Sequence, residues 1–446
     1  MDLIRGISGI RGIVNNSLTD SVIIKYAKAF SELQNGRTIL VARDTRSSGN
    51  EYIDLVTNCL KDCGNKVINC GIIPTPTAQF LIEKNNYDGG IVITASHNPS
   101  EWNGMKFIDS DGCFLNKTQN INLFKIADFG QSNHYSNNGS IEVIKNGYVS
   151  HVNHTQQLSV INLEAIKEKN FSVVVDAVNG AASEALPTML EKLGCQVYKI
   201  NCVPDGKFPR GTEPIPENLK DLGKAVIKNN ADIGFATDPD GDRLAIVDEK
   251  GIPIGEEYTL VICADGILKS SILKSPIVTN LSTTMALDDI AENYNSEIVR
   301  TEVGEINVVN KMKQLDSELG GEGNGGVILT ESHLGRDSLV GATLFLNRLS
   351  QSDYSVSKIF ESMPQYIMIK DKIQIKTIDP KIALEKIELE FSQVNCDKSD
   401  GLKLLWNDSW VHIRKSNTEP IIRIYAESKS SKKIKLIIET IKKLFT

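Results

Sequence analysis

The chain has 446 residues, of which 41% are hydrophobic and 24% charged, with a formal net charge of −7 at pH 7. This length is too great for one core and predicts roughly three or four domains, while the mild negative charge argues against a dedicated nucleic-acid surface. No apolar run approaches about 18 residues and the N-terminus carries no apolar signal segment, so we expect neither a membrane span nor secretion. Eight cysteines without a Cys-x-x-Cys pair favour reduced thiols and a cytoplasmic location.

A weak internal repeat runs through the first three quarters of the chain. In each copy a strand leads through a small, polar turn into a helix, which is followed by a second strand, another helix and finally a polar or glycine-rich loop. The predicted strands and helices of the three copies are 38–42, 66–70 and 75–84; 172–176, 196–201 and 217–229; and 276–280, 297–301 and 306–319. Strands that alternate with helices indicate βαβ units with right-handed crossovers and mostly parallel pairing.

Domain boundaries are expected where the repeat restarts and where it ends. The C-terminal part follows another plan, typical of a small α+β domain, with strands near 403–406, 410–414 and 421–427 and a closing helix at 432–445. The predicted fold class is therefore α/β, with three consecutive βαβ-type domains of similar, mostly parallel topology and a smaller C-terminal α+β domain. The predicted domains are 1–153, 154–253, 254–366 and 367–446.

The segment GIVITASHNPSEWNGMKF, residues 90–107, places a serine just after an apolar run. Val92 and Ile93 suit a strand covered on both faces, and Asn98-Pro99 ends any regular element. Ser96 is therefore expected on an exposed loop at the carboxyl end of a strand, where ligands bind in open α/β sheets. A plain turn or a helix cap explains the same residues, so this segment alone does not identify a nucleophile.

Three aspartates follow the strand IGFAT. Asp238, Asp240 and Asp242 alternate with proline and glycine, so their carboxylates could converge on one hard cation, and Mg²⁺ fits because it takes oxygen ligands. An EF-hand is excluded because Arg243 stands at the sixth position, where glycine is needed. An arginine directly after three aspartates suggests a phosphate partner, and the alternative is an acidic solvated turn.

The third loop, Gly321 to Gly326, satisfies the spacing G-x-G-x-x-G. We reject a dinucleotide site because these glycines are predicted to follow a helix and precede a strand, which reverses the required order. Glu322 and Asn324 could instead hydrogen-bond sugar hydroxyls. A plain glycine-rich connection is the alternative.

A phosphate cradle is predicted near the C-terminus, in RKSNTEPIIRIY. Two arginines bracket hydroxyls, an amide and backbone N–H groups, a set that suits a phosphate dianion, and an exposed hairpin with incidental charges is the alternative. The residues are Arg414, Ser416, Asn417, Thr418 and Arg423.

Eight short motifs in one order resemble the α-D-phosphohexomutase family, which comprises phosphoglucomutases, phosphomannomutases and phosphoglucosamine mutases. The resemblance extends from one end of the chain to the other. The motifs are SGIRG (8–12), ARDTRSSG (42–49), PTP (74–76), TASHNP (94–99), NGMK (103–106), DPDGDR (238–243), GEGNGG (321–326) and RKSNTEP (414–420).

The resemblance implies a mechanism and a cofactor. Ser96 would be a phosphoserine that donates its phosphoryl group to a hexose monophosphate, and the resulting hexose 1,6-bisphosphate would turn in a central cleft between the four domains and return its other phosphate. One Mg²⁺ per chain would be bound by Asp238, Asp240, Asp242 and a Ser96 phosphate oxygen, and would offset charge on the transferring group. The net change moves the phosphate between O6 and O1.

The resemblance also implies roles for the remaining site residues. Lys106 and His97 would transfer protons, and a lysine pKa lowered by burial would suit a base. Arg11 and Arg243 would contact phosphate. The cradle from Arg414 to Arg423 would hold the phosphate that is not transferred, and the C-terminal domain is expected to hinge about residues 363–370 and close over the cleft.

The sugar loop departs from a common form of the family. Gly326 stands where a histidine often ends the loop, and Asn324 where serine is frequent. Glu305 occupies another variable sugar-site position, and an acid near C2 could favour a substrate ammonium. The resemblance therefore favours conversion of glucosamine 6-phosphate to glucosamine 1-phosphate for amino-sugar nucleotide and cell-wall precursor synthesis.

Other functions remain open at this stage. A phosphomannomutase or phosphoglucomutase is the first alternative, and a Mg²⁺-dependent phosphatase acting through Ser96 is another. A non-catalytic sugar-phosphate sensor is disfavoured because a binder needs neither a nucleophile nor the three aspartates. The expected partners are small-molecule hexose phosphates, and the sequence leaves open whether the chain is a monomer or a homodimer.

Overall fold

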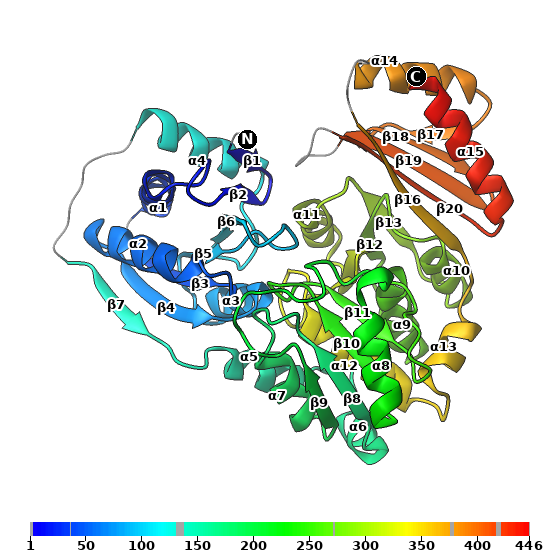
Figure 1. The fold of residues 1–446 in the computed structure, drawn as a ribbon, viewed down its shortest axis with the longest axis horizontal. Helices are drawn as coiled ribbons and strands as arrows, with labels where there is room; N and C mark the ends of the chain where they lie inside the picture. The colour runs from blue at the N-terminus through cyan, green and yellow to red at the C-terminus, as the bar shows by residue number, and fades with distance from the viewer. Residues whose placement is uncertain are drawn as a thin grey trace.

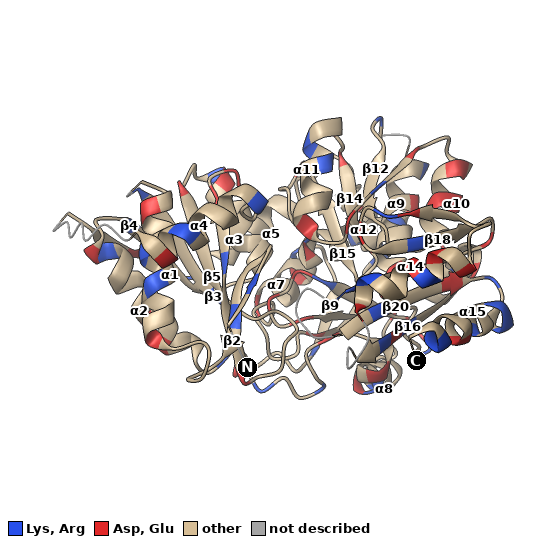
Figure 2. Ribbon diagram, turned by 90° about the horizontal axis from the view of Figure 1, so that it is seen from above, with Lys and Arg blue, Asp and Glu red and all other residues tan. Residues whose placement is uncertain are grey.

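A computed structural model describes residues 3–35, 37–130, 138–270, 273–374, 379–415 and 421–445. These residues form four β-sheets in chain order, each packed with helices (Figure 1). Lysine, arginine and acidic residues are interspersed on the outer helices (Figure 2). Across the described ranges, no helix is both long enough and apolar enough to cross a membrane.

The first sheet has seven strands in the order β1-β2-β6-β5-β3-β4-β7. Side chains alternate along β3, so Ile39 and Val41 enter one core while Leu40 and Ala42 enter the other. Helices α1 (Asp20–Leu33), α2 (Gly49–Asp62) and α4 (Lys117–Phe129) cover the first face, and α3 (Thr75–Lys84) and α5 (Tyr148–Thr155) the second. The strands are β1 (Ile4–Gly6), β2 (Gly9–Ile13), β3 (Thr38–Arg43), β4 (Lys66–Ile72), β5 (Gly89–Ile93), β6 (Trp102–Asp109) and β7 (Ser140–Val143).

The second and third sheets repeat the centre of the first. The orders β6-β5-β3-β4, β11-β10-β8-β9 and β15-β14-β12-β13 correspond, and in each the first strand is antiparallel and the others parallel. This correspondence confirms the predicted repeat of three similar, mostly parallel units. The strands are β8 (Ser172–Asp176), β9 (Gln196–Ile200), β10 (Ile233–Thr237), β11 (Leu244–Val247), β12 (Ile277–Asn280), β13 (Ile298–Thr301), β14 (Leu319–Glu322) and β15 (Gly326–Leu329).

Helices connect and cover these two sheets. The predicted helix at 217–229 is divided into a 3-10 turn, η1 (Pro216–Asn218), and α8 (Lys220–Asn229). The others are α6 (Leu163–Lys169), α7 (Ala185–Lys192), α9 (Glu257–Lys269), α10 (Ala286–Asn293), α11 (Glu305–Leu315), α12 (Ser338–Ser350) and α13 (Val356–Ser362).

Strands β6 and β14 complete the repeat, and the apolar pattern predicts neither. The helix predicted at 306–319 ends at Leu315, and Leu319 begins β14. The expectation that the glycine loop directly follows a helix is therefore wrong, because strand β14 lies between them. The residues LGGE have almost no pattern of apolar side chains, and they form a strand through pairing with β12 and β15. The dinucleotide motif is still excluded, since a strand and no helix follows the glycines.

The C-terminal part is a small antiparallel α+β unit, as predicted. Its sheet has the order β16-β20-β19-β18-β17, and α15 packs on it. Helix α14 and strand β17 are not predicted from the sequence. The elements are β16 (Ile367–Gln374), α14 (Pro380–Glu390), β17 (Asn395–Asp397), β18 (Leu402–Trp406), β19 (Ser409–Lys415), β20 (Ile421–Ser428) and α15 (Ser431–Leu444).

One hydrophobic core serves both the second and the third sheet. Phe235 from β10, Leu319 from β14 and Phe345 from α12 belong to a single buried cluster. The rings of Phe235 and Phe345 meet edge to face, with centroids 6.1 Å apart. A boundary at 253/254 would thus divide the chain without dividing this core, and the three boundaries between the four domains stay predictions.

Polar contacts join the C-terminal unit to the third sheet. Glu427 accepts a hydrogen bond from the backbone N–H of Met285 at 2.7 Å, and buried Lys403 donates to the carbonyl of Leu281 at 2.5 Å. His412 Nδ1 lies 2.8 Å from Ser282 Oγ. Hydrogen bonds between buried or half-buried groups therefore cross this interface. A substitution that leaves one of these groups without its partner would lower the free energy of unfolding.

We expect His412 to make the stability of this interface depend on pH. Nε2 of His412 donates to the carbonyl of Asp400 at 2.6 Å, so Nδ1 is the acceptor for Ser282. Burial lowers the pKa of His412 to about 4, whereas an unfolded histidine titrates near about 6.5. The unfolded chain therefore binds the proton first as pH falls, and the stabilisation present above about pH 6.5 is lost progressively towards pH 4.

Denaturant unfolding of the C-terminal unit at pH 7 and pH 5 tests this dependence. Between these values the wild-type protein should lose about 2 kcal/mol more of its free energy of unfolding than a His412→Gln variant. Equal losses in the two proteins would contradict the role assigned to His412.

Candidate active site

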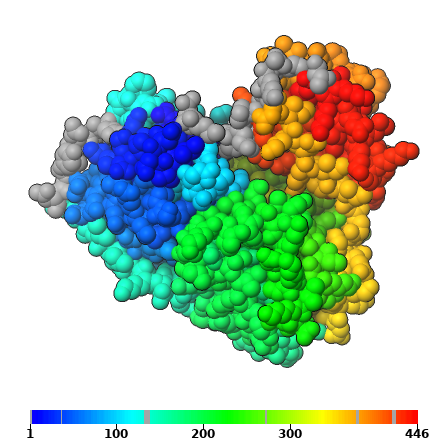
Figure 3. All heavy atoms as spheres, viewed as in Figure 1, coloured from blue at the N-terminus to red at the C-terminus, as the bar shows by residue number. Residues whose placement is uncertain are grey.

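The main cleft lies where the four parts of the chain meet, and has a volume of about 910 Å³. Figure 3 shows the surface hollowed between the N-terminal part in blue and cyan and the C-terminal part in orange and red. Ten predicted site residues line it: Arg11, Ser96, His97, Lys106, Arg243, Glu305, Glu322, Asn324, Arg414 and Arg423. Ser416, Asn417 and Thr418 lie outside the described residues.

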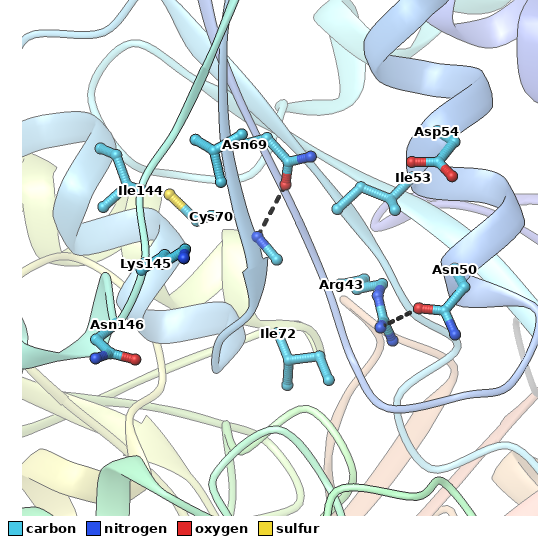
Figure 4. Close-up of a pocket in the computed structure, with 12 residues that line it drawn as sticks. Arg43, Asn50, Ile53, Asp54, Asn69, Cys70, Ile72, Ile144, Lys145 and Asn146 are labelled. Atoms are coloured by element: carbon cyan, nitrogen blue, oxygen red, sulfur yellow. Dashed lines mark hydrogen bonds between the residues drawn. The ribbon is translucent and has the colours of Figure 1, made fainter.

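A second cavity, of about 660 Å³, lies between α2 and the edge of the first sheet (Figure 4). Two of its polar side chains already have partners in the protein: the Arg43 guanidinium donates to Asn50, and Asn69 Oδ1 accepts from the N–H of Gly71 at 2.9 Å. The lining has Asp54 as its one carboxylate and no hydroxyl side chain. The candidate chemistry therefore lies in the main cleft.

Ser96 lies three residues beyond the end of β5 and is turned into the protein. It has a left-handed backbone conformation with φ of 50°, and only 2% of its surface is exposed, so the prediction of an exposed loop is wrong. The cause is the packing of this loop against the aspartate loop of the second sheet, where Ser96 Oγ lies 3.2 Å from Asp238 Oδ2. The hydroxyl faces the cleft from a buried, fixed position.

Arg46 holds the Ser96 loop, a role that the sequence analysis does not assign. Its guanidinium donates to Asp44 Oδ2 at 3.0 Å, and Thr94 donates to the same oxygen at 2.6 Å. The only available signal was the motif ARDTRSSG, which contains Arg46 without showing its target. Arg46 also donates, at 2.6–2.9 Å, to the backbone carbonyls of Ser96, Asn98, Pro99 and Trp102.

Replacing Arg46 with lysine should misplace the Ser96 loop. A single ammonium cannot reach four carbonyls, so we expect kcat to fall about 100-fold with KM little changed. The measurement is steady-state kinetics of the hexose phosphate interconversion that the sequence motifs predict, with thermal unfolding to confirm folding. Arg43→Lys is the matched control, because Arg43 belongs to the same motif but faces the second cavity. An equal loss of kcat in the control would count against the role of Arg46.

Three buried carboxylates form a group that could hold a metal ion. Ligand atoms of Asp238, Asp240 and Asp242 lie within 4.8 Å of one another. Asp240 Oδ1 and Asp242 Oδ1 are buried without any hydrogen-bond partner, so each offers a free oxygen. Oxygen donors of this kind suit a hard divalent cation such as Mg²⁺. The residues present therefore fit the predicted ion.

Electrostatic interactions differ among these aspartates. Burial, together with repulsion from Asp242 and Asp240, raises the pKa of Asp238 well above its usual value. Burial also opposes ionisation of Asp240, but the Lys106 ammonium 2.6 Å away outweighs it and lowers the pKa of that carboxyl. A cation next to the three carboxylates would therefore be strongly stabilised.

Lys106 reaches the aspartates from β6, where it pairs with Val92 in the neighbouring antiparallel strand. Burial disfavours its charged form, yet Asp240 and Asp242 together raise its pKa above the usual value. The expectation of a lysine pKa lowered by burial is therefore wrong for this structure. The cause lies in a contact across 134 residues of sequence.

His97 lies in the same cleft as Ser96, beside Arg11 and Arg243, and Arg243 Nε also lies 4.0 Å from Asp238 Oδ2 and 3.8 Å from Asp242 Oδ1. Burial, followed by repulsion from Arg243 and Arg11, lowers the pKa of His97 well below its usual value, so the imidazole is neutral. Its Nδ1 lies 3.1 Å from Arg243 Nη2. Arg11 donates to Asn98 Oδ1 at 2.9 Å, and burial lowers its pKa to about 10. Arg243 thus donates to Nδ1 of a neutral imidazole, and the two cations disfavour protonation of His97.

Arg414 and Arg423 stand directly opposite each other across β19 and β20. Like charges at paired positions repel, and an anion placed between them would relieve that repulsion. Arg414 is also paired with Asp400 at 3.0 Å. This arrangement is compatible with the predicted phosphate cradle.

The predicted sugar subsite, by which we mean Glu305, Glu322 and Asn324, lies beside an arginine that the sequence patterns do not single out. Arg336 contacts Glu322 Oε2 at 2.7 Å, Glu305 Oε2 at 3.0 Å and Asp242 Oδ2 at 2.7 Å. Its motif signal is weak, because HLGRD lies outside the loops that end the repeats. Arg336 connects the sugar subsite to the aspartate group.

A second buried group, His151, His333 and Asp337, also brings ligand atoms within 4.8 Å. Here the carboxylate already has structural partners, since Asp337 Oδ1 accepts from Leu339 N at the start of α12 and Oδ2 lies 2.9 Å and 3.1 Å from the two histidines. Both histidines and the aspartate are about 1% exposed or less. We therefore interpret this group as a joint between the first and third units.

Known proteins match the chain over its whole length. It matches alpha/beta/alpha domains I, II and III and the C-terminal domain of the phosphoglucomutase/phosphomannomutase family over residues 2–133, 146–251, 256–366 and 373–444. A phosphoglucomutase/phosphomannomutase of Thermococcus kodakarensis is 36% identical, over 97% of this chain and 96% of that protein. A phosphoglucosamine/phosphogalactosamine mutase of Sulfurisphaera tokodaii is 31% identical, over 98% of both.

A solved structure has the same fold. A phosphoglucomutase/phosphomannomutase family protein of Burkholderia thailandensis superposes with a TM-score of 0.87 at 26% identity, covering 99% of this chain and 96% of that one. Four matching domains in one order define a phosphohexomutase, an intramolecular phosphotransferase. The chain belongs to the phosphoglucomutase/phosphomannomutase family, within the α-D-phosphohexomutases.

Proposed function

We propose that this enzyme interconverts hexose 6-phosphate and hexose 1-phosphate through a phosphoserine at Ser96 and a hexose 1,6-bisphosphate. The observation that carries the proposal is the buried Ser96 hydroxyl, 3.2 Å from Asp238, in a cleft that also contains the Arg414–Arg423 pair. A nucleophile and an anion site that face one cleft suit a substrate with two positions for phosphate.

Proton transfer is assigned to the two groups beside Ser96. His97 would accept the proton of the attacking sugar hydroxyl at Nδ1 once Arg243 turns from that nitrogen to the phosphoryl group, and the Lys106 ammonium would give a proton to Ser96 Oγ as its bond to phosphorus breaks. The phosphoryl group thereby moves from Ser96 to the sugar oxygen, and the reverse sequence returns the other phosphate. Arg11 and Arg243 would contact the transferring group.

One Mg²⁺, held by Asp238, Asp240, Asp242 and a phosphate oxygen on Ser96, would supply positive charge against the phosphoryl group when bound. The phosphate at the other end of the sugar would lie between Arg414 and Arg423, with Ser416, Asn417 and Thr418 beside it. Either end of the sugar could then face Ser96.

Glucosamine phosphate is the substrate that we propose first. The sugar subsite holds two acids, Glu305 and Glu322, against one guanidinium, so its excess negative charge suits an ammonium group. The name of the Sulfurisphaera tokodaii relative supports the same choice. The product would feed amino-sugar nucleotide synthesis and cell-wall precursors, and we place the enzyme in the cytoplasm.

Phosphoglucomutase or phosphomannomutase activity is the second candidate, because one observation favours it. Glu305 already accepts from Arg336 at 3.0 Å and from Gln79 at 3.3 Å, so its charge is partly committed. The Thermococcus kodakarensis relative carries that name. A neutral hydroxyl at C2 would then serve as well as an ammonium.

A coupled assay with the 6-phosphates or 1-phosphates of glucosamine, glucose and mannose decides between these candidates. Each sugar is tested with Mg²⁺ and a trace of hexose 1,6-bisphosphate. We expect kcat/KM for glucosamine phosphate to exceed the others by about tenfold, and Glu305→Gln to reduce this preference. Preference for glucose or mannose phosphate would support the second candidate. Release of free phosphate would indicate a phosphatase, and absence of turnover with every sugar would indicate a sensor.

A further inference from the structure

Arg336 lies in the connection from β15 to α12 and is 8% exposed. Its three contacting nitrogens each meet a different carboxylate: Nη1 meets Glu322, Nη2 meets Asp242 and Nε meets Glu305. These acids come from β14, the loop after β10 and the first turn of α11. One rigid guanidinium therefore fixes groups from three separate elements.

Gly326 makes this arrangement possible. A Cβ atom built at Gly326 would lie 2.2 Å from Arg336 Cδ and 2.8 Å from its Cγ, distances too short for any side chain to share the space. The backbone N–H of Gly326 donates to Asn324 Oδ1 at 3.2 Å. The sugar loop thus ends in a residue whose missing side chain leaves room for an arginine from elsewhere in the chain.

Glu322 is held at both oxygens. Its Oε1 accepts from Asn280 Nδ2 at 2.7 Å and from the N–H of Gly304 at 3.1 Å, while Oε2 accepts from Arg336. Glu305 has no comparable backbone support and depends on Arg336 and Gln79. Loss of the guanidinium would leave both acids buried and less well oriented.

We propose that Arg336 is a positioning residue that fixes Glu305 and Glu322 for contact with the sugar ring, and that glycine is required at position 326 to admit it. This inference rests on the proposed function, because it assigns those acids to the sugar. The loop from Gly321 to Gly326 and Arg336 form one functional unit, in which the guanidinium comes from the connection between β15 and α12.

Four variants test the unit with the hexose phosphate that the wild-type enzyme turns over best: Arg336→Ala, Arg336→Lys, Gly326→Ala and the Gly326→Ala/Arg336→Ala double variant. We expect Arg336→Ala to lower kcat/KM about 100-fold with a clear rise in KM, since misplaced substrate contacts act on binding and reaction together. Arg336→Lys should recover about tenfold of this loss, because an ammonium keeps the charge but not the fork.

The glycine variants separate positioning from general damage. Gly326→Ala alone should reproduce most of the Arg336→Ala loss by displacing the arginine. In the double variant the added methyl group has no Cγ or Cδ to displace, and its remaining close neighbour, Asn324 Oδ1 at 3.1 Å, needs only a small shift, so its kcat/KM should stay close to that of Arg336→Ala. Additive losses would overturn the proposal, as would a folded Arg336→Ala enzyme with unchanged KM.

Arg348→Ala is the matched control. Arg348 is also buried, at 6% exposed, and pairs with Asp265 on α9, away from the cleft. Thermal unfolding of both variants reports the structural cost, and we expect KM to rise only in Arg336→Ala. An equal rise in KM in the control would reduce Arg336 to a structural role and overturn the proposal. Lack of mutase turnover in the wild-type enzyme would instead refute the proposed function itself.

Discussion

Replacing Ser96 with alanine is expected to abolish hexose phosphate interconversion, with a loss in kcat of about 10⁴-fold or more. Alanine removes the oxygen that would carry the phosphoryl group, while the neighbouring contacts of Arg46 to the loop carbonyls involve no side chain of residue 96. Substrate binding should therefore survive. The measurement is steady-state turnover with Mg²⁺ and hexose 1,6-bisphosphate, together with binding of the sugar phosphate by calorimetry.

Ser100→Ala provides the control, because Ser100 is an exposed hydroxyl in the same loop. Its activity should match the wild-type enzyme. Intact-mass analysis after incubation with the bisphosphate should show one added phosphate on the wild-type and Ser100→Ala proteins, and none on Ser96→Ala. Wild-type turnover by Ser96→Ala would remove the central assignment of this site.

Replacing Asp240 with asparagine should have the second largest effect. The amide removes one negative oxygen from the aspartate group and deprives Lys106 of its partner at 2.6 Å. We expect kcat to fall about 10³-fold, and the affinity for Mn²⁺, measured directly by electron paramagnetic resonance as a Mg²⁺ substitute, to fall about 100-fold. Treatment of the wild-type enzyme with a chelator should remove activity, and added Mg²⁺ should restore it.

The matched control for this variant is Asp232→Asn. Asp232 precedes β10, at the end of the strand opposite the aspartate group, and its carboxylate accepts from Ser172 N at 2.8 Å. It should keep wild-type metal affinity and turnover. Unchanged Mn²⁺ binding in Asp240→Asn would exclude Asp240 as a ligand.

The local sequence is sufficient to predict the internal repeat and the loop that ends each copy. The β-branched apolar runs of β5 and β10 are typical of strands covered on both faces, and the polar residues after them could be located without a structure. The helix Thr75–Lys84 has the predicted bounds. Strand β14 could not be found in this way, because two of its four residues are glycine and its identity comes from its partners.

Properties that depend on distant contacts could not be predicted. The raised pKa of Lys106 results from aspartates in another unit, and the burial of Ser96 results from the same packing. Arg46 and Arg336 look like ordinary charged residues in the sequence, since only the fold shows that one meets four carbonyls and the other three carboxylates. The position of Glu305 in the chain predicts that it belongs to the site, but nothing in the sequence indicates that Arg336 is its partner.

The hydrophobic core shared by the second and third sheets determines which distances in the cleft can vary. The aspartate loop and the sugar loop are both attached to this core, and Arg336 links them directly. The first unit carries Ser96 and the C-terminal unit carries Arg414 and Arg423, so an opening of the cleft that leaves this core intact would move the proposed phosphoryl donor or the proposed phosphate anchor relative to the core. The bisphosphate of the proposed reaction would then turn in front of an aspartate loop and a glycine-rich loop whose separation stays constant.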